Sequence, residues 1–336
     1  MSSSSKPPPP CSRRHVAISL ALGGLLTGAG FSPGSAKAQA FPSKPIRILV
    51  GYSAGGGVDA MARLLATGLS AALGQQVLIE NRTWASGLIA ADAVAKSAPD
   101  GYTLLVGESG MLIANSMQTN RTLDPLKSFA PVAGLFIVPL LIVANNDFPA
   151  KTPGELVAEL KSKPGRYSYA TSGIGTVQHL GFEMLKERTG TFVVHIPYRG
   201  AAQIVPDVIG GQVPLGVVSA SAGLAQAKAG KLRALAMMSV ARLPGAEGVP
   251  TLADALPGFD IAPRLWLLAP AGTPPAIVAR LGDVVRAVLS SPDTVQSAFA
   301  QGGVPAYLSG PALAAEMNRE SARWEQTLES RKIVVK

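Results

Sequence analysis

The sequence predicts an α/β protein of two domains, each built on a mostly parallel sheet flanked by helices. Strand-like apolar runs alternate with helix-like runs along the 336 residues, which is typical of βαβ units. The pattern stops and begins again after Asn145, and a stretch rich in proline and glycine, Pro250 to Pro263, precedes one more apolar run. We therefore expect two sheet assemblies joined by crossing segments.

The first assembly begins with a strand from Ile46 to Val50. The helix that follows carries Met61, Leu65 and Leu69 at helical spacing and ends at Gly74. We expect further strands at 76–80 and 102–106 and a short helix at 90–96. Residues 107–131 are polar and turn-rich, and residues 135–144 are predicted as one long strand broken by a proline.

The second assembly begins with a helix after Thr152, which caps it together with Glu155. Strands are expected at 167–170, 193–197, 213–219 and 232–239, with helices at 176–188, 203–209 and 224–229. A strand at 265–269 and helices from 273 and from about 312 to 330 complete the chain. We expect a discontinuous first domain, residues 41–142 plus 264–336, and a second domain, residues 143–263.

The first forty residues predict an export signal. Arg13 and Arg14 precede an apolar run, and Ala38-Gln39-Ala40 is a signal peptidase pattern that leaves Phe41 as the new N-terminus. The paired arginines fit either the Sec or the twin-arginine route. The single cysteine, Cys11, lies before the apolar run, so we expect a periplasmic mature chain without disulfides.

Composition argues against several classes of function. The formal charge of +9 falls to about +5 once the four cations of the signal are removed, and the sequence lacks a basic run with interleaved aromatics, so we expect no nucleic-acid partner. His179 and His195 are the two histidines of the mature chain, and no tight carboxylate cluster accompanies them. We therefore expect no metal ion and no cofactor.

Gly51-Tyr52-Ser53-Ala54-Gly55 follows the first strand and spells the nucleophile turn of a serine hydrolase. A secreted α/β hydrolase using Ser53 is therefore one alternative, although the turn comes too early for the strands that precede such a nucleophile. A dinucleotide turn is another, with Glu80 as its acid, but the adjacent glycines lack the required spacing. The third interpretation is anion capture by main-chain N–H groups at the start of the helix.

A second turn of the same kind supports anion capture. Thr171-Ser172-Gly173-Ile174-Gly175-Thr176 also joins a strand to a helix, and it adds the hydroxyls of Ser172 and Thr176. The two turns could face each other across a cleft. Taken singly, either turn is equally well explained as an ordinary capped βα turn, and His179 and Asp59 as structural partners.

Many ordered motifs resemble those of one family. They include Phe41-Pro42-Ser43-Lys44-Pro45, Gly55-Gly56-Gly57-Val58-Asp59, Pro99-Asp100-Gly101-Tyr102, Tyr169-Ala170-Thr171-Ser172-Gly173 and His195-Ile196-Pro197-Tyr198-Arg199. The mature chain resembles the Bug-type extracytoplasmic solute receptors, the substrate-binding components of tripartite tricarboxylate transporters. The resemblance implies a two-domain Venus-flytrap fold, a small organic carboxylate as ligand, membrane permease subunits as partners, no enzymatic activity and a monomer.

The resemblance also implies the ligand-binding residues. They lie in both turns and at the end of the seventh predicted strand: Tyr52, Ser53, Ala54, Gly55, Gly56, Gly57, Asp59, Ser172, Gly173, Gly175, Thr176 and Ser219. This chain departs from the family pattern at Val58, at Trp84 and near Ser219, where an aspartate is common. We hypothesise that the missing acid favours a ligand without an amino group. A solute sensor that is not coupled to transport is a further alternative.

Overall fold

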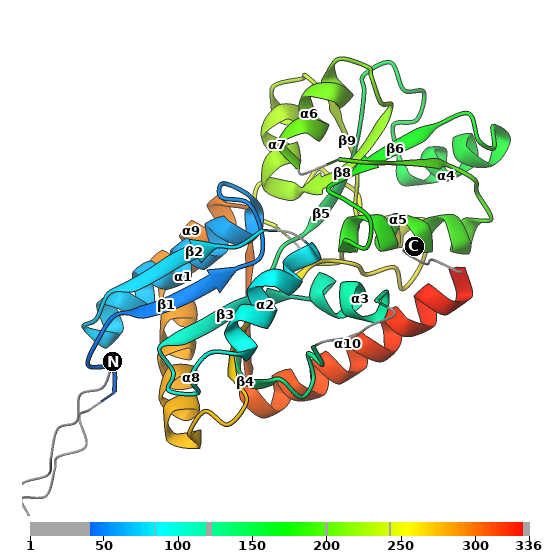
Figure 1. Cartoon of the computed structure of the whole chain (residues 1–336). Helices are drawn as coiled ribbons and strands as arrows, with labels where there is room; N and C mark the ends of the chain where they lie inside the picture. The colour runs from blue at the N-terminus through cyan, green and yellow to red at the C-terminus, as the bar shows by residue number, and fades with distance from the viewer. Residues whose placement is uncertain (1–40, 84, 119–122, 199–200, 242, 332–336) are drawn as a thin grey trace, which may run out of the picture. The chain divides into compact units, whose positions relative to one another are not determined.

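Two β-sheets, each covered by helices, organise the chain (Figure 1). The structure is a computed structural model that describes residues 41–83, 85–118, 123–198, 201–241 and 243–331. The predicted export signal, Cys11 and the predicted cleavage site after Ala40 lie outside these residues. Both sheets belong to one compact unit, residues 40–336.

The first sheet has six strands from two separate parts of the chain, residues 46–137 and 264–309. Its strands are β1 (Ile46–Val50), β2 (Val77–Asn81), β3 (Thr103–Glu108), β4 (Phe129–Ile137), β10 (Arg264–Pro270) and β11 (Val304–Ser309). Their order is β11-β4-β10-β3-β1-β2. β1 is parallel to both β2 and β3, so their carboxyl ends meet at one edge of the sheet.

The second sheet has five strands from the middle of the chain. They are β5 (Leu140–Ala144), β6 (Ser168–Thr171), β7 (Val194–Pro197), β8 (Leu215–Ser219) and β9 (Arg233–Met237), in the order β7-β6-β8-β5-β9. β6 is parallel to β7 and β8. The turns that follow β6 and β8 therefore lie at the same edge.

Both sheets are mixed, whereas the sequence predicted mostly parallel sheets. In the first sheet β10 pairs antiparallel with β3 and β4, and β11 with β4. In the second sheet β5 pairs antiparallel with β8 and β9. The reversed strands are β5, by which the chain enters the second sheet, β10, by which it returns to the first, and the last strand, β11. Such strands need no βαβ crossover, so nothing requires them to be parallel.

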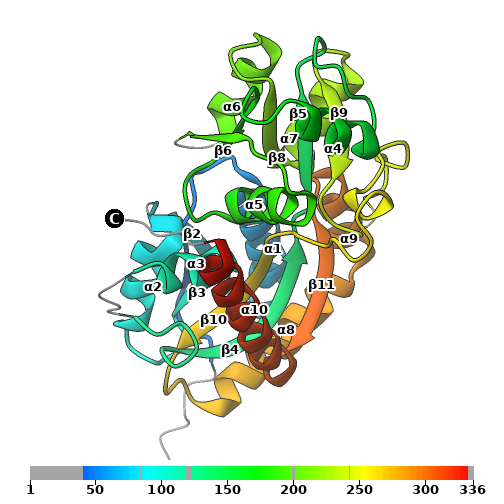
Figure 2. The ribbon, with the colours of Figure 1, turned by 90° about the vertical axis from the view of Figure 1, so that its right-hand side faces the viewer.

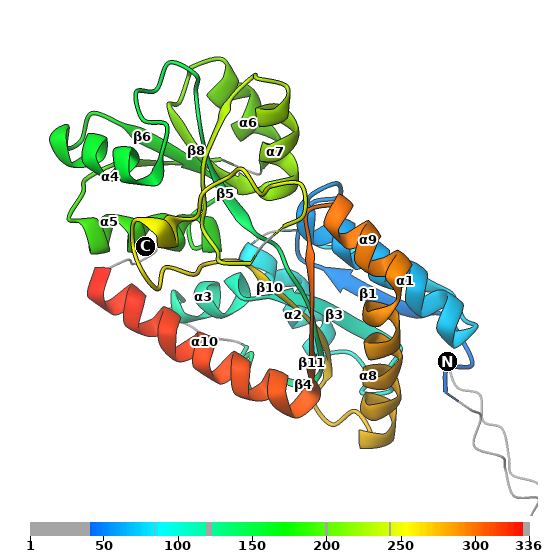
Figure 3. The same cartoon turned by 180° about the vertical axis from the view of Figure 1, so that it is seen from behind.

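Helices cover both faces of each sheet. They are α1 (Gly57–Leu73), α2 (Leu88–Ala95), α3 (Gly110–Ser116), α4 (Pro153–Ser162), α5 (Val177–Thr189), α6 (Ala201–Ile209), α7 (Ala220–Lys228), α8 (Pro275–Ser290), α9 (Pro292–Ala300) and α10 (Gly310–Arg331), with short 3₁₀ turns at Ala85–Gly87 and Leu252–Asp254. α1, α8 and α9 lie side by side on one face of the first sheet (Figure 3). α10 lies against α3 and β4 on the other face (Figure 2).

The apolar periodicity of α1 explains its position. Met61, Leu65 and Leu69 are at most 1 % exposed and pack with β1 and α8 in one core cluster. α1 ends where Gly74 adopts a φ of 64°, as the sequence predicts. The packing of this helix fixes the position of its first turn at the carboxyl edge of the first sheet.

Three segments differ from the sequence-based expectation. The segment predicted as one strand over residues 135–144 forms the end of β4 and all of β5, which belong to different sheets because the chain crosses between them at Val138 and Pro139. The stretch predicted as turn-rich contains α3 and the start of β4. α9 and β11 were not predicted. α10 also contributes Trp324 and Leu328 to a core cluster of the second sheet.

Candidate ligand-binding site

The first candidate turn joins β1 to α1 and is fixed by the buried carboxylate of Asp59. Gly55 has a φ of 81°, which favours glycine, and its N–H donates to Asp59 Oδ2 at 2.9 Å. The carboxylate also accepts from Arg63 Nε and Asn81 Nδ2, each at 2.8 Å. Burial acts to raise the pKa of Asp59, but hydrogen bonds from Arg63, Gly55 and Asn81 outweigh it and lower that pKa. Both oxygens of Asp59 thus serve to shape the turn.

The first turn of α1 offers main-chain donors. The first N–H groups of an α-helix have no acceptor within the helix, and with the helix dipole they favour anions. The N–H of Ala60 donates to Gly56 O at 2.9 Å. Within the described part of the chain, no acceptor is found for the N–H groups of Gly57, Val58 and Asp59. These three donors can therefore bind an external anion.

Tyr52, in the same turn, is hydrogen-bonded to a residue that the sequence analysis did not select. Its hydroxyl donates to Glu108 Oε1, at the end of β3, and lies 3.3 Å from Ser86 O. Glu108 Oε1 also accepts from Gly110 N at 2.9 Å. Burial raises the pKa of Glu108 to about 7, with hydrogen bonds from Tyr52 and Gly110 opposing it and the charge of Glu320 adding to it. Burial, followed by the charge of Glu108, also raises the pKa of Tyr52.

The sequence did contain a signal for Glu108. It is a charged residue that directly follows the buried run Leu104 to Gly107, at the edge where the turn after β1 also lies. The polar character of residues 107–131 predicts a series of turns, and this pattern gives Glu108 no functional role.

The second candidate turn joins β6 to α5 and is fixed by hydrogen bonds to Gly173 O. The hydroxyls of Thr176 and Thr171 donate to this oxygen at 2.8 and 3.1 Å. Thr176 also caps α5, since its hydroxyl accepts from His179 N at 3.3 Å. Gly175 has a φ of 75°, and its N–H donates to His179 Nδ1 at 3.3 Å.

Two stacked histidine rings support the second turn. The rings of His179 and His195 lie 4.1 Å apart, and His195 Nε2 lies 2.7 Å from Thr171 Oγ1. Since the Thr171 hydroxyl donates to Gly173 O, it accepts from His195. Burial lowers the pKa of His179 to about 4, and burial together with the charge of His179 lowers the pKa of His195 to about 3. Both rings are therefore neutral supports of the turn at neutral pH.

The two sheets contact each other through these turns. An added Cβ on Gly57 would lie 3.2 Å from Val138 Cγ1 and 3.6 Å from Ser219 Cβ, which is at the end of β8. An added Cβ on Gly175 would lie 2.9 Å from the sulfur of Met117, which follows α3. Ser219 therefore lies beside the first turn, and the second turn lies beside the end of α3.

The remaining predicted residues lie on these two turns and at the end of β8. Ser53 and Ala54 are exposed on the first turn, Gly56 precedes α1, and Ser172 is half-buried on the second turn. Ser219 Oγ lies 3.1 Å from Ser221 Oγ. Trp84 and Arg199 lie outside the described residues. The structure thus places Ser219 against the first turn and Met117 against the second, while ligand contact at each residue stays a prediction.

The features that other functions require are not found in the described residues. Ser53 forms no side-chain hydrogen bond there to a histidine, and both histidines belong to elements of the second sheet. No group of three or more His, Cys, Asp or Glu side chains in that part of the chain could hold a metal ion. None of the described helices combines the length and apolar character needed to span a membrane.

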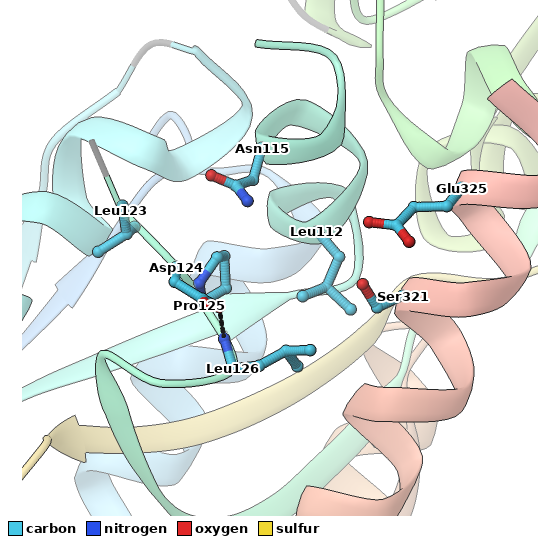
Figure 4. Close-up of a pocket in the computed structure, with 8 residues that line it drawn as sticks. All are labelled: Leu112, Asn115, Leu123, Asp124, Pro125, Leu126, Ser321 and Glu325. Carbon is cyan, nitrogen blue, oxygen red and sulfur yellow. Dashed lines mark hydrogen bonds between the residues drawn. The ribbon is translucent and has the colours of Figure 1, made fainter. Parts of the chain in front are cut away.

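A separate pocket of about 490 Å³ lies between α3, residues 123–126 and α10 (Figure 4). Its lining includes Leu112 and Asn115 of α3 and Ser321 of α10. Asn115 is 7 % exposed, and its Oδ1 has no hydrogen-bond partner among the described residues. The pocket contains none of the predicted ligand-binding residues.

Comparison with known proteins identifies the family of this chain. The family model described as the tripartite tricarboxylate transporter family receptor matches residues 61–333. Protein BugT from Bordetella pertussis is 34 % identical over 308 residues, which cover 91 % of this chain and 94 % of BugT.

Solved structures are similar over most of both chains. The periplasmic binding protein BugD shares 31 % identity with a TM-score of 0.78, covering 88 % of this chain and 99 % of BugD. A protein from R. palustris solved with adipate shares 32 % identity with a TM-score of 0.81 over the same shares of the two chains. MatC from Rhodopseudomonas palustris with bound malate shares 30 % identity with a TM-score of 0.76, covering 86 % of this chain and all of MatC. The chain therefore belongs to the receptor family of the tripartite tricarboxylate transporters and has the fold of its periplasmic solute-binding proteins.

Proposed function

We propose that the protein is a periplasmic receptor that binds a small organic carboxylate between its two sheets and delivers it to the permease of a tripartite transporter. The observation that supports this most strongly is that Gly57 of the first turn lies against Ser219 of the second sheet, while Gly175 of the second turn lies against Met117, which follows α3. Two structurally similar relatives carry adipate and malate in their structures. The turns bind through main-chain donors, so the protein acts as a receptor without catalytic chemistry.

The proposal includes how the chain reaches and uses its site. The signal is cleaved after about Ala40, the mature protein is a monomer, and permease subunits are its membrane partners. Residues 41–142 plus 264–336 and residues 143–263 act as two domains that close on the ligand. Because β5 of the second sheet begins at Leu140, the first hinge is placed at Val138 and Pro139. A ligand that contacts both turns stabilises the closed state by its differential affinity.

A thermal-shift screen of carboxylates, followed by calorimetry, tests the function. A ligand that binds only the folded protein adds about 2.7 kcal/mol of stability at one hundred times its Kd. We expect saturable stabilisation by at least one mono- or dicarboxylate. Aspartate and succinate, which differ by an amino group, form a matched pair, and we expect succinate to bind more tightly. Stabilisation by uncharged solutes alone would contradict the proposed ligand class.

A further inference from the structure

We propose that Glu108 is a ligand-contacting residue of this site, which donates a hydrogen bond from a protonated carboxyl group to an anionic carboxylate and so couples ligand binding to proton uptake. This inference rests on the proposed function. Glu108 then determines which ligands the site accepts, and its protonation adds a measurable proton to the binding equilibrium.

Glu108 is placed correctly for such a contact. It ends β3, at the carboxyl edge shared with the turn after β1, and Tyr52 of that turn donates to its Oε1. Side chains alternate along a strand, so Glu108 is on the same face as Leu104 and Val106, which pack in the cluster that includes α1. The carboxyl group lies between Tyr52, whose turn leads into α1, and Gly110 N at the start of α3, and the charge of Glu320 on α10 also acts on it.

The two oxygens of Glu108 differ in their environment. Oε1 accepts from Tyr52 and from Gly110 N at 2.9 Å. Oε2 has no hydrogen-bond partner among the described residues. It is nevertheless not fully enclosed by protein atoms. The residue as a whole is 4 % exposed. A nearly buried carboxyl group with one accessible, unpaired oxygen can form one more hydrogen bond.

The charges around Glu108 favour its neutral form. The ionisable groups on neighbouring elements include Tyr52 and Glu320, which act on Glu108 directly, and also Asp59, Arg63, Arg264 and Glu316. Arg63 is paired with Asp59 at 2.8 Å, while Arg264 lies 3.9 Å from both Asp260 and Glu316. No ion pair between Glu108 and a cation is found in the described part of the chain. Burial raises the pKa of Glu108 to about 7, so near neutral pH it is ready to take up a proton.

The charge of an anionic ligand couples ligand binding to the protonation of Glu108. A carboxylate held by the N–H groups of α1 adds a negative charge beside Glu108, which raises the pKa of Glu108 further. The proton on Oε2 then forms a charge-assisted hydrogen bond to the ligand. A ligand ammonium group would act in the opposite direction, because it stabilises the ionised carboxylate and releases a proton. The direction of proton transfer therefore reports the ligand class.

Calorimetry of the full mature protein tests this coupling. Malate, succinate and adipate are titrated near pH 8 in two buffers of different ionisation enthalpy, and the difference in heat gives the protons exchanged. We expect net uptake of nearly one proton for each ligand that binds. We also expect affinity to fall about tenfold between about pH 6 and about pH 8, since each pH unit above the pKa leaves tenfold less neutral acid.

Variants assign the proton to Glu108. Glu108→Gln keeps a donor but cannot titrate, so we expect no proton uptake and little pH dependence. Asp92→Asn is the matched control, because Asp92 lies on α2 beside β3 but is paired with Lys96. It should keep the wild-type uptake. The wild-type titration needs no variant, so it decides even where Glu108→Gln fails to fold. Binding without uptake, or with proton release, overturns this inference alone. Stabilisation by no carboxylate overturns the proposed function as well.

Discussion

Gly57, at the start of α1 on the first sheet, lies against Ser219, at the end of β8 in the second sheet. An added Cβ on Gly57 would be 3.6 Å from Ser219 Cβ. This contact connects two residues that are far apart in sequence and brings the donors of α1 to the second sheet. This contact supports the proposed ligand site between the two sheets.

Gly57→Val tests whether ligand binding needs the close contact between Gly57 and Ser219. Its Cβ would lie 3.2 Å from Val138 Cγ1, which is tight, and the added methyl groups push the sheets apart. We expect carboxylate affinity to fall by about tenfold or more, which is a loss of about 1.4 kcal/mol. Calorimetry measures it. Gly154→Val is the matched control, since a Cβ there meets nothing within 4 Å. Equal affinity of the two variants would show that the close approach is unimportant.

Asp59→Asn tests the support of the first turn. Replacing the carboxylate weakens the hydrogen bonds to Gly55, Arg63 and Asn81, so we expect a loss of about 2 kcal/mol in the free energy of unfolding. The lowered pKa of Asp59 means that its contribution is present above the unfolded-state pKa, near 3.8, and is lost as pH falls below it. Urea denaturation measures both effects. Asp92→Asn, at a partly exposed helix pair, should change stability by less than about 0.5 kcal/mol.

Acid should destabilise the support of the second turn. The pKa of His179 is lowered from 6.5 to about 4, so the unfolded chain binds more protons between these values and stability falls as pH is lowered through that window. The contribution of His179 is on the order of 3 kcal/mol. We expect His179→Gln to flatten the pH dependence of the free energy of unfolding between about pH 6.5 and about pH 4. An unchanged slope would mean that His179 is not buried as a neutral ring.

Glu108 should make the free energy of unfolding fall as pH rises, which is the opposite of the effect of His179. Its pKa is raised from 4.5 to about 7, so the folded protein binds the extra proton and stability is lost as pH rises through this window. Glu108→Gln removes that loss and should stabilise the free protein at about pH 8 by roughly 2 to 3 kcal/mol. Thermal and urea unfolding at two pH values provide the measurement. Destabilisation at the higher pH would contradict the burial of an ionisable carboxyl here.

The main-chain character of the site predicts a mild effect of Ser53→Ala. Ser53 is exposed, and no hydrogen bond to a histidine activates it in the described residues. We expect the variant to keep most of the ligand-induced thermal stabilisation and the wild-type protein to resist labelling by a fluorophosphonate. Covalent labelling at Ser53 would favour the hydrolase alternative.

Local patterns in the sequence were sufficient to predict most elements, because each pattern has a direct physical cause. Met61, Leu65 and Leu69 predicted α1, and the Thr152 cap predicted the start of α4. Pro139 was correctly recognised as an interruption, but the sequence alone does not show that the residues on its two sides join different sheets. That choice depends on pairing between distant strands, such as β5 with β8.

The candidate site was predictable only in part, for the same reason. Glycines and hydroxyl residues after strands identified the two turns. The contact of Gly57 with Ser219 and the hydrogen bond between Tyr52 and Glu108 join residues from separate segments, so no local pattern contains them. Val58 and the absence of an acid near Ser219 predict a change in specificity, whereas the acid found beside Tyr52 of the first turn is Glu108, from a different strand.

A crystal structure with a bound carboxylate, such as malate or succinate, tests the central claim most directly. We predict that a ligand carboxylate accepts hydrogen bonds from the N–H groups at the start of α1, while the same ligand contacts the turn from Ser172 to Thr176 in the second sheet. A ligand that contacts one sheet alone, or that occupies the pocket between α3 and α10, would contradict the claim.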